Sequence, residues 1–559
     1  MVVVSLSYSD LVGLLGKEVP LKELENVIPM MGAGHEGVED EVIRMDIFPN
    51  RPDMYSVEGV ARALRGFLGM EEGLPRYSAR VSGFDFLVDE NVKDVRPYAV
   101  AGLIKGLRLT EEMVVSIVEL QERLHTGLGR KRKKVAIGLH DFDKVEPPFH
   151  YKAFGREEVS FVPLGETEEM SLGRILREHE KGKEYGWILE GKDLLPLILD
   201  VKDRVLSFPP VINGVVTALT PETENILVDV TGTDLQAVKS ALNIIMTAMA
   251  ERGGKMYSVT IIYPEEAIET PDLSPVKRRI SLQRANELLG LNLPPSEAVS
   301  CLRRMRLDAK AEGDRLVVKI PAYRTDILHE VDLVEDLAIG YGFSRLLPEL
   351  PRSMTLGEAS RLNEFTEVLK QVFMGHGLQE VRTLTLQDSG VPYRSWESPL
   401  GLFNPITSDL TVVRSSLLPS ILEILRLNRH RELPQRIFEV DDVVKLGRNR
   451  RHVAGALIHP KASFTEVKGL IQGVLRDLGL SADVEEEQDE NFLEGRCASP
   501  IVDGKSLGLF GELKPEVITA YQLGYPVTAF ELDAKAIFDK VEAKGAFSQE
   551  WPPRGRRPR

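Results

Sequence analysis

Apolar residues recur every three or four positions in the stretch after Pro321, which ends a strand-like run over residues 315–320. This spacing is typical of one face of an α-helix. The residues of this face are Ile327, Val331, Val334, Ala338 and Tyr341. Just before them, Thr325 and Asp326 each carry an oxygen that can accept a hydrogen bond from the first helical turn. The pattern therefore predicts an amphipathic helix that is capped at Thr325 or Asp326.

Similar patterns predict further elements in the first half of the chain. A proline-rich turn at residues 50–53 precedes a helical pattern from Val57 to Leu68. A second helix is predicted over Met113–Leu124 and a strand over Val135–Leu139. Between them lies a basic run at residues 130–134, which is either a solvated turn or a contact surface for RNA phosphate.

Two segments between residues 205 and 234 combine strand-like and polar character. The first contains Pro209 and Pro210, which indicate a turn. The second is an apolar strand pattern from Ile226 that becomes polar at Asp229 and Thr231. Polar side chains at the end of a strand, beside a proline turn, can line a small cleft. Residues of this kind more often cap or stabilise turns, so both interpretations stay open.

The helix predicted after Pro321 also carries an acidic face. Asp332, Glu335 and Asp336 are three and four residues apart, and Asp326 precedes them. Like charges at this spacing weaken a helix by about a few tenths of a kcal/mol per pair. A divalent cation reverses that effect, and carboxylate ligation without His or Cys suits Mg²⁺. The alternative is a solvated acidic face whose first turn complements the helix dipole.

The composition of the 559-residue chain narrows the classes of protein to which it can belong. At typical domain sizes this length corresponds to about four domains. Lys and Arg number 70 against 85 Asp and Glu, and the net charge of −15 argues against a surface that is basic throughout for nucleic acid. Only Cys301 and Cys497 are present, which fits a reducing cytoplasm. We expect no signal peptide and no membrane segment, since no apolar run approaches about 18 residues.

Several motifs of catalytic and nucleotide-binding sites are missing from the sequence. It contains no Gly-Lys-Ser/Thr phosphate loop, no zinc-protease helix and no serine nucleophile elbow. Gly32, Gly34 and Gly37 match the spacing of a dinucleotide-binding motif. The residues that follow, 38–47, have a strand pattern rather than a helical one, so we interpret these glycines as a turn.

Five stretches of the sequence together are distinctive. They are Asn50–Asp53, Gln121–His125 with Ala136–Asp141, Ile320–Phe343, Phe403–Glu423 and Ala529–Asp533. These stretches resemble, in the same order, the β subunits of phenylalanyl-tRNA synthetases of the archaeal and eukaryotic-cytosolic type. The resemblance covers the chain from residue 1 to about residue 540.

This resemblance implies a multidomain fold that combines α+β and α/β units. The implied domains are B1 over residues 1–84, the B3/B4 editing domain over 85–265, a small winged-helix-like B5 domain over 274–350, and B6/B7 over 355–540. B6/B7 is expected to be built like a class II synthetase catalytic core, an antiparallel sheet flanked by helices. A proline-rich linker is predicted over Pro264–Pro275. Residues 545–559 fall outside the family pattern and are expected to form a disordered basic tail.

The resemblance also implies a function. The chain is expected to join an α subunit in an α2β2 heterotetramer that ligates L-phenylalanine to tRNA(Phe), with ATP as a substrate of the complex. The resemblance further implies that the α subunit activates the amino acid, and this agrees with the sequence, in which no pair of ATP-binding arginines can be assembled in B6/B7. Arg414 alone has a suggestive position, and we expect it to form a structural ion pair. The β chain is expected to scaffold the complex, bind tRNA and hydrolyse mischarged Tyr-tRNA(Phe).

Site residues follow from the family by motif. The implied editing pocket consists of Ser207, Asp229, Thr231, Asn213 and Ile198. The implied site for one Mg²⁺ per β chain, at the border with the α subunit, consists of Asp326, Asp332, Glu335 and Asp336. Two alternatives remain: a tRNA-binding scaffold subunit without editing activity, and an unrelated magnesium-dependent phosphoryl-transfer enzyme that uses the four carboxylates. The second lacks a loop that could hold a phosphate.

Overall fold

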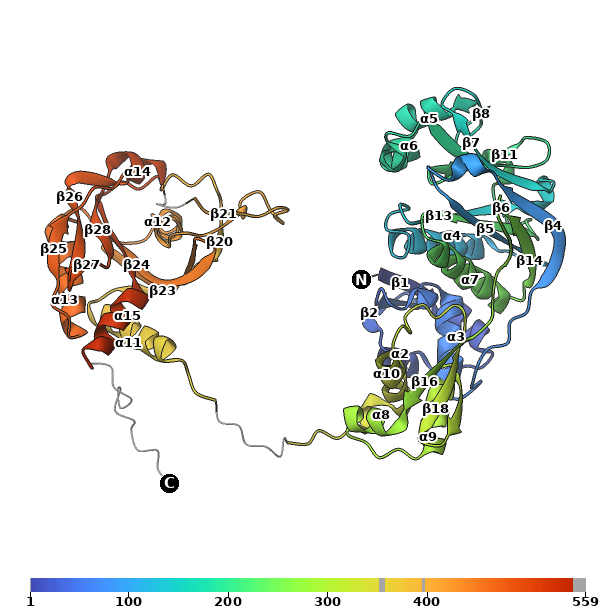
Figure 1. Cartoon of the computed structure of the whole chain (residues 1–559), viewed down its shortest axis with the longest axis horizontal. Helices are drawn as coiled ribbons and strands as arrows, with labels where there is room; N and C mark the ends of the chain where they lie inside the picture. Colours follow the sequence, from blue (N-terminus) through green and yellow to red (C-terminus); the bar gives the residue numbers. More distant parts are fainter. Residues whose placement is uncertain (1, 351–356, 395–397, 546–559) are drawn as a thin grey trace. The chain divides into compact units, whose positions relative to one another are not determined.

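The computed structural model describes residues 2–350, 357–394 and 398–545. The chain divides into two compact units, residues 1–350 and 351–559 (Figure 1). The predicted assignment of domains to these units stays a prediction. The basic tail predicted over residues 545–559 lies, apart from Gly545, outside the described residues.

The first unit begins with a small layer of helices on a three-stranded antiparallel sheet of order β1-β3-β2. Its elements are β1 (Val2–Ser7), α1 (Tyr8–Leu15), α2 (Leu21–Met30), β2 (Gly34–Glu39), β3 (Val42–Ile47) and α3 (Val57–Phe67). Ser56 caps α3 by accepting a hydrogen bond from the Gly59 N–H, so the helix predicted there is confirmed. Of the three glycines, Gly32 lies in a turn as expected, whereas Gly34 and Gly37 lie within strand β2, so no helix follows the glycine motif.

A ten-stranded mixed sheet forms the centre of the first unit, in the order β12-β11-β10-β7-β4-β14-β5-β13-β6 with β15 paired to β14. Its strands are β4 (Arg80–Val88), β5 (Tyr98–Lys105), β6 (Val135–Asp141), β7 (Phe149–Gly155), β10 (Leu194–Leu199), β11 (Val205–Phe208), β12 (Ile212–Asn213), β13 (Ile226–Gly232), β14 (Lys255–Ile262) and β15 (Ala267–Thr270). The helices α4 (Glu111–Thr126) and α7 (Leu235–Glu251) pack on β6 and on β5 with β13. Because β15 belongs to the sheet, the linker predicted over Pro264–Pro275 is partly a strand.

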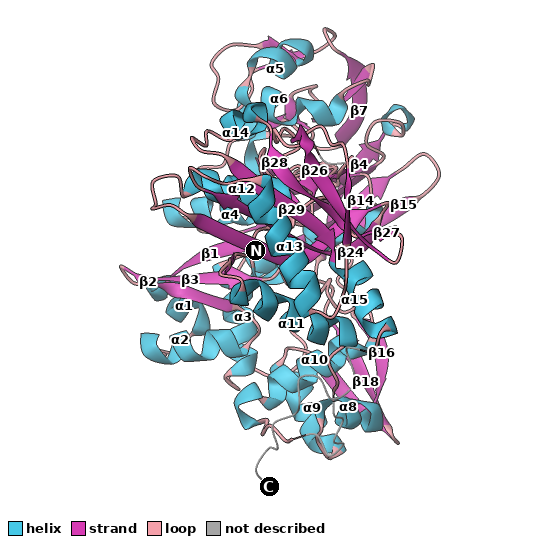
Figure 2. Ribbon diagram, turned by 90° about the vertical axis from the view of Figure 1, so that its left-hand side faces the viewer, coloured by secondary structure: helices cyan, strands magenta, loops and turns pink. Residues whose placement is uncertain are grey.

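A segment inserted between β7 and β10 and a small domain complete the first unit. The inserted segment contains β8 (Ser160–Phe161), β9 (Met170–Ser171), α5 (Leu172–Glu178) and α6 (Glu180–Tyr185). The small domain holds β16 (Val276–Ser281), α8 (Leu282–Leu289), α9 (Pro295–Arg304), β17 (Asp308–Glu312), β18 (Arg315–Ile320) and α10 (Glu330–Tyr341) (Figure 2). One apolar core, to which Val4, Ile245 and Leu337 belong, joins this domain to the N-terminal layer and to α7.

Helix α10 starts later than its sequence pattern predicts. It begins at Glu330 with His329 as the N-cap, so Thr325 and Asp326 are not its caps. The carboxylate of Asp332 accepts hydrogen bonds from the backbone N–H groups of Leu328 and His329 at 2.7 and 2.6 Å, which fixes the start of the first turn. The buried face also differs, because Val331 is 56% exposed. The apolar side chains that this helix buries are Leu333, Val334, Leu337, Ala338 and Ile339.

The second unit contains a sheet of order β19-β23-β24-β29-β28-β26-β25, antiparallel except where β19 meets β23. The strands are β19 (Gln379–Glu380), β23 (Gln435–Lys445), β24 (Arg448–Ile458), β25 (Asp483–Glu486), β26 (Phe492–Val502), β28 (Gly508–Leu513) and β29 (Val527–Asp533). The helices are α11 (Arg361–Gly375), α12 (Leu418–Leu427), α13 (Phe464–Asp477), α14 (Pro515–Ala520) and α15 (Ala534–Ala543). Two separate apolar clusters, around Phe373 and around Leu422, pack helices against this sheet. The expected relation of this unit to class II catalytic cores stays a prediction.

Among the described residues, no helix is long and apolar enough to span a membrane.

Candidate functional site

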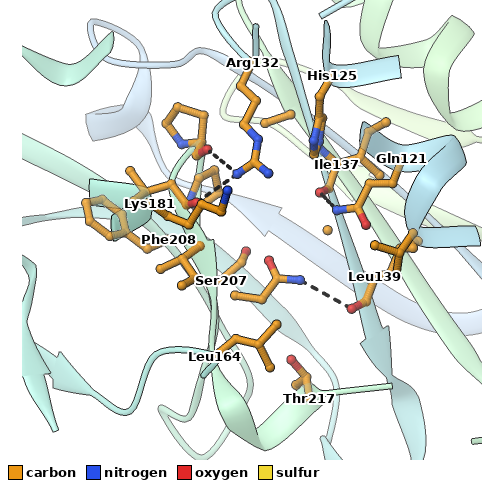
Figure 3. Close-up of a pocket in the computed structure, with 18 of the residues that line it drawn as sticks. Gln121, His125, Arg132, Ile137, Leu139, Leu164, Lys181, Ser207, Phe208 and Thr217 are labelled. Carbon is orange, nitrogen blue, oxygen red and sulfur yellow. Dashed lines mark hydrogen bonds between the residues drawn. The ribbon is translucent and has the colours of Figure 1, made fainter. Parts of the chain in front are cut away.

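A cavity of about 510 Å³ lies in the ten-stranded sheet domain. This volume is in the range of small-molecule binding sites. Its walls come from α4, the following loop, β6, β11, β12, β13 and α6 (Figure 3). The proline turn at Pro209 and Pro210 belongs to the wall, so the polar residues near it line a cleft.

The structure brings four of the five predicted pocket residues together. Ser207, Asn213, Asp229 and Thr231 all line the cavity. Ile198 is not among the lining residues. It lies in β10, is paired with Ser207 of β11, and is fully buried in an apolar cluster. The role of these residues in hydrolysis stays a prediction.

Asp229 is held in the middle of a strand. The sequence pattern placed it at a strand end or in a turn, but β13 continues to Gly232. Its side chain is buried, and its Oδ2 lies 2.7 Å from His140 Nε2. The other ring nitrogen of His140 is 2.8 Å from the Thr217 hydroxyl. The Asp229 carboxylate is therefore fixed through Oδ2, and no hydrogen bond to its Oδ1 is found among the described residues.

Gly138 makes room for this arrangement. It pairs with Asp229 across β6 and β13. A Cβ atom at position 138 would lie 1.9 Å from Asp229 Oδ2 and 2.6 Å from His140 Nε2. Real Cβ atoms do not approach this closely, so any side chain here forces the carboxylate or the imidazole to move.

The Ser207 hydroxyl differs from the Thr231 hydroxyl because it has no hydrogen-bond partner. The residue is 2% exposed, and its Oγ has no hydrogen bond within the described part of the chain. Leaving a buried hydroxyl unsatisfied costs about 1–3 kcal/mol, and each such group in a folded protein calls for an explanation. By contrast, the Thr231 hydroxyl accepts a hydrogen bond from Arg96 Nε at 2.9 Å. Asn213 Nδ2 lies 3.4 Å from the Leu139 carbonyl oxygen.

The cavity has a charged end that we did not predict as part of the pocket. Arg132 donates to Glu122 Oε1 at 2.6 Å and to the Val211 carbonyl oxygen at 2.9 Å, and it lies 4.2 Å from the centre of the Tyr185 ring. His125 Nε2 accepts from the Ile137 N–H at 2.8 Å. The proton of its neutral ring therefore sits on Nδ1, 3.1 Å from Glu122.

Burial and these contacts change the pKa values of His125 and Glu122. Burial lowers the pKa of His125, which keeps the ring neutral. Burial opposes ionisation of Glu122, but the hydrogen bond from His125 and the charge of Arg132 outweigh it and lower its pKa to about 2. The signal for these residues was present in the stretches Gln121–His125 and Arg130–Lys134. Nothing in their spacing indicated that they meet at one cavity.

Three of the four carboxylates of the expected magnesium site already accept hydrogen bonds from the chain, and the fourth is exposed. Arg324 donates to Asp326 at 2.8 and 2.6 Å and to Asp336 at 2.8 Å. Asp332 accepts from backbone N–H groups at the start of α10, and Glu335 is exposed. Among the described residues, no group of three or more acidic, His or Cys side chains is placed to hold a metal. As a set these residues do not fit a cation in this arrangement, and the magnesium site stays a prediction.

Burial and charge act in opposite directions on this cluster. Burial raises the pKa of Asp336 in spite of the nearby Arg324. For Asp326, burial is outweighed by the charge and hydrogen bonds of Arg324, so its pKa falls below the ordinary value. The pKa of Arg324 rises well above its ordinary value, because its two carboxylate partners outweigh the cost of burial.

Arg414 in the second unit forms the structural ion pair that we expected. It is fully buried and lies 3.0 Å from Glu439 and 3.1 Å from Asp441. It also donates to the Thr383 hydroxyl at 2.8 Å. The guanidinium is therefore paired with carboxylates of its own chain, although its Nη2 has no hydrogen bond among the described residues.

Comparison with known proteins points to one family. A family model described as "tRNA synthetase B5 domain" matches residues 278–343, and one described as "Phenylalanyl tRNA synthetase beta chain CLM domain" matches residues 347–534. The phenylalanine–tRNA ligase beta subunit of Archaeoglobus fulgidus is 44% identical over 549 residues, which cover 97% of this chain and 100% of that protein. The beta subunit of Methanosarcina acetivorans is 43% identical over 549 residues, with the same coverage.

A solved structure agrees with these relatives. The crystal structure of an N-terminal fragment of the phenylalanyl-tRNA synthetase beta-subunit from Pyrococcus horikoshii is 41% identical to this chain, with a TM-score of 0.59. The match covers 61% of this chain and 99% of the fragment.

Proposed function

Since this chain belongs to the phenylalanyl-tRNA synthetase β-subunit family and is thus a component of an aminoacyl-tRNA ligase, we propose that it assembles with an α subunit as α2β2. The complex attaches L-phenylalanine to tRNA(Phe) in the cytoplasm and releases AMP and diphosphate from ATP. In this proposal the β chain supplies structure and tRNA contacts, while amino-acid activation takes place on the α subunit.

The second unit supports a scaffold role for the class II-like domain. Its most buried arginine, Arg414, is neutralised by Glu439 and Asp441 and is not available to a nucleotide phosphate. We expect the purified β chain to show no phenylalanine-dependent exchange between ATP and pyrophosphate, and the complex with α to show it. Exchange by β alone would contradict this assignment.

We further propose that the cavity hydrolyses Tyr-tRNA(Phe). A pocket that accepts phenylalanine excludes tyrosine only about a hundredfold, because the two differ by one added hydroxyl. A second site that bonds this hydroxyl rejects phenylalanine much more strongly, since its polar groups would be left unpaired. The observation that carries the proposal is the unpartnered, buried Ser207 hydroxyl beside Asp229 in a cavity of about 510 Å³.

The chain's own groups suggest how the pocket works. Asp229, fixed through Oδ2 by His140, has Oδ1 available to accept a hydrogen bond from the tyrosine hydroxyl, and Ser207 is a second partner. Ser207 itself is not the nucleophile, because within the described residues no base lies within hydrogen-bond distance of its Oγ. Water therefore attacks the ester carbonyl, the bond to the ribose oxygen breaks, and free tyrosine and tRNA leave.

Replacement of Ser207 by alanine tests the editing proposal. If the hydroxyl is kept for a ligand, Ser207→Ala removes an unsatisfied polar group, so stability stays equal or rises while Tyr-tRNA hydrolysis falls. Phenylalanine charging by the complex serves as the control and stays unchanged. If Tyr-tRNA hydrolysis is undetectable in the parent complex, the chain is a tRNA-binding scaffold without editing activity.

We also propose that one Mg²⁺ per β chain binds at Asp326, Asp332, Glu335 and Asp336. In the arrangement described above, Arg324 holds two of these carboxylates, so metal binding requires this side chain to move. The double variant Glu335→Gln with Asp336→Asn tests the proposal. It should abolish any increase of thermal stability or of assembly with α on addition of MgCl2. An unchanged magnesium response would mean that these residues are only an acidic helix face.

A further inference from the structure

The loop between α4 and β6 has an unusual backbone. Arg130, Lys131 and Arg132 have φ angles of 49°, 54° and 65°. All three are in the left-handed region, which costs a residue other than glycine roughly 1–2 kcal/mol. Three such residues in succession persist only where their surroundings determine the conformation, and such strain is concentrated at functional sites.

Several contacts hold this loop in place. The Arg132 N–H donates to the His125 carbonyl oxygen at 3.1 Å, and the Lys134 N–H to that of Gly129 at 2.8 Å. The buried guanidinium of Arg96 donates to the Lys133 carbonyl oxygen at 3.1 Å. The side chain of Arg132 lines the cavity. The loop is thus built as a fixed part of the cavity rim.

Three other side chains of the loop are basic and exposed to solvent, whereas Lys134 forms an ion pair with Asp234. Arg130, Lys131 and Lys133 are exposed. Within the described residues, no carboxylate forms an ion pair with any of the three. The chain as a whole carries a net charge of −15, so this uncompensated cluster is not a sample of its average surface. It lies directly beside Arg132, which lines the cavity.

We propose that Arg130, Lys131 and Lys133, here called the basic loop, bind backbone phosphates of the RNA strand whose 3′ end enters the cavity. This inference rests on the proposed hydrolysis of Tyr-tRNA in that cavity. An ester bound there is attached to the terminal ribose, so the phosphates next to it must pass the rim. Lys and Arg side chains that replace counterions on these phosphates strengthen binding without reading the bases.

The fixed backbone of the basic loop allows its charges to orient a bound RNA strand. A flexible basic turn attracts RNA but does not orient it. A loop held by His125, Gly129 and Arg96 keeps its cations at a constant distance from the cavity, so binding of phosphate also positions the ester.

The test uses the complete α–β complex and two substrates. The variant Arg130→Gln, Lys131→Gln, Lys133→Gln is compared with the parent on Tyr-tRNA(Phe) and on 2′(3′)-O-tyrosyl-adenosine, which carries the tyrosyl ester on the same ribose but no phosphate. For Tyr-tRNA the variant should raise KM severalfold at low salt and keep kcat. The slope of log(1/KM) against log[salt] should become shallower by about 2 for three lost contacts on a single strand. Hydrolysis of tyrosyl-adenosine should be unchanged.

A matched control removes the same charge elsewhere. Lys17, Lys93 and Lys310 are exposed and lie outside the cavity wall, and their triple Gln variant should retain the salt slope of the parent. An unchanged KM and salt slope in the basic-loop variant would overturn the proposal and leave a solvated turn. So would a loss of tyrosyl-adenosine hydrolysis, since the loop would then act on the cavity itself.

A binding measurement separates this inference from the editing proposal. Uncharged tRNA(Phe) and a short RNA stem with a single-stranded 3′ end are titrated against both complexes without any hydrolysis step. Weaker binding by the basic-loop variant supports the phosphate contacts even if the parent hydrolyses neither ester, in which case only the editing proposal fails. Equal competition by polyglutamate would show a general anion surface and would overturn the assignment to RNA.

Discussion

The two large sheets of this protein both bury charged groups, but they satisfy them differently. In the second unit, Glu531 accepts hydrogen bonds from Ser416, His452 and the backbone at the start of α12, and Arg414 is paired with Glu439. In the first unit, the chain Thr217–His140–Asp229 ends at a cavity, beside a Ser207 hydroxyl that has no partner. The second unit also contains a buried atom without a hydrogen bond, Arg414 Nη2, but Ser207 Oγ differs from it because Ser207 lines a cavity, which makes this hydroxyl a candidate contact for a ligand.

The largest effect is expected when the buried charge of Arg414 in the second unit is removed. Arg414→Met leaves Glu439 and Asp441 without their buried partner, and the free energy of unfolding should fall by about 3–5 kcal/mol. Urea unfolding of the full chain, followed by circular dichroism, measures this loss. Arg382→Met is the matched control, because Arg382 also faces Asp441, at 3.9 Å, but its side chain is 82% exposed. A loss of similar size in both variants would contradict the contrast.

The corresponding change beside the cavity of the first unit, Asp229→Ala, should lower activity more than stability. With Asp229→Ala, Tyr-tRNA hydrolysis should fall roughly 100-fold, as expected for a lost hydrogen bond to a charged group. Phenylalanine charging should remain near normal, so that Tyr-tRNA accumulates. Deacylation and aminoacylation assays on the same complex measure both. If stability and both activities decline together, Asp229 is a structural residue like Glu531.

A subtler change keeps every polar group and disturbs only their geometry. Gly138→Ala places a methyl group against Asp229 Oδ2 and His140 Nε2, and we expect about a tenfold loss of Tyr-tRNA hydrolysis, since small displacements of catalytic groups are costly. The control is Gly13→Ala in α1, where an added Cβ meets nothing within 4 Å. Full activity of Gly138→Ala would show that the precise position of the carboxylate is unimportant.

The smallest expected effect concerns the charged end of the cavity. The pKa of Glu122 is about 2 in the folded chain against an ordinary value of 4.5. Its stabilising contribution is therefore complete above pH 4.5 and is lost as the pH falls toward 2. Because the side chain is 43% exposed, we expect less than about 1 kcal/mol. The difference in unfolding free energy between the parent and Glu122→Gln, measured from pH 5 downward, should shrink with falling pH. A difference independent of pH would contradict this origin.

Local features were predictable from the sequence where local chemistry decides them. The Ser56-capped helix α3 and the turn at Pro209 and Pro210 follow from short-range preferences. Helix α10 was misplaced because Thr325 and Asp326 are good caps in isolation. Asp326 is instead bound by Arg324, and the carboxylate of Asp332 sets the helix start.

The cavity was only partly predictable because its members come from strands distant in the sequence. The strand containing Asp229 lies next to Gly138 and close to His140 only after β13 pairs with β6. Arg132 enters the wall through a left-handed turn that basic residues alone do not indicate. Ile198 shows the converse error. It is paired with Ser207 in the sheet, and it belongs to an apolar cluster and does not line the cavity.

Arg96 joins the basic loop to the cavity wall. One buried guanidinium donates to the Lys133 carbonyl oxygen in the basic loop and to both oxygens of Thr231 in the cavity wall. Burial lowers its pKa to about 10, so it remains a cation at neutral pH. If this link is stiff, occupation of the loop and occupation of the cavity are thermodynamically linked. If a bound oligonucleotide raises the affinity for the amino acid by some factor, a bound amino acid raises the affinity for the oligonucleotide by the same factor.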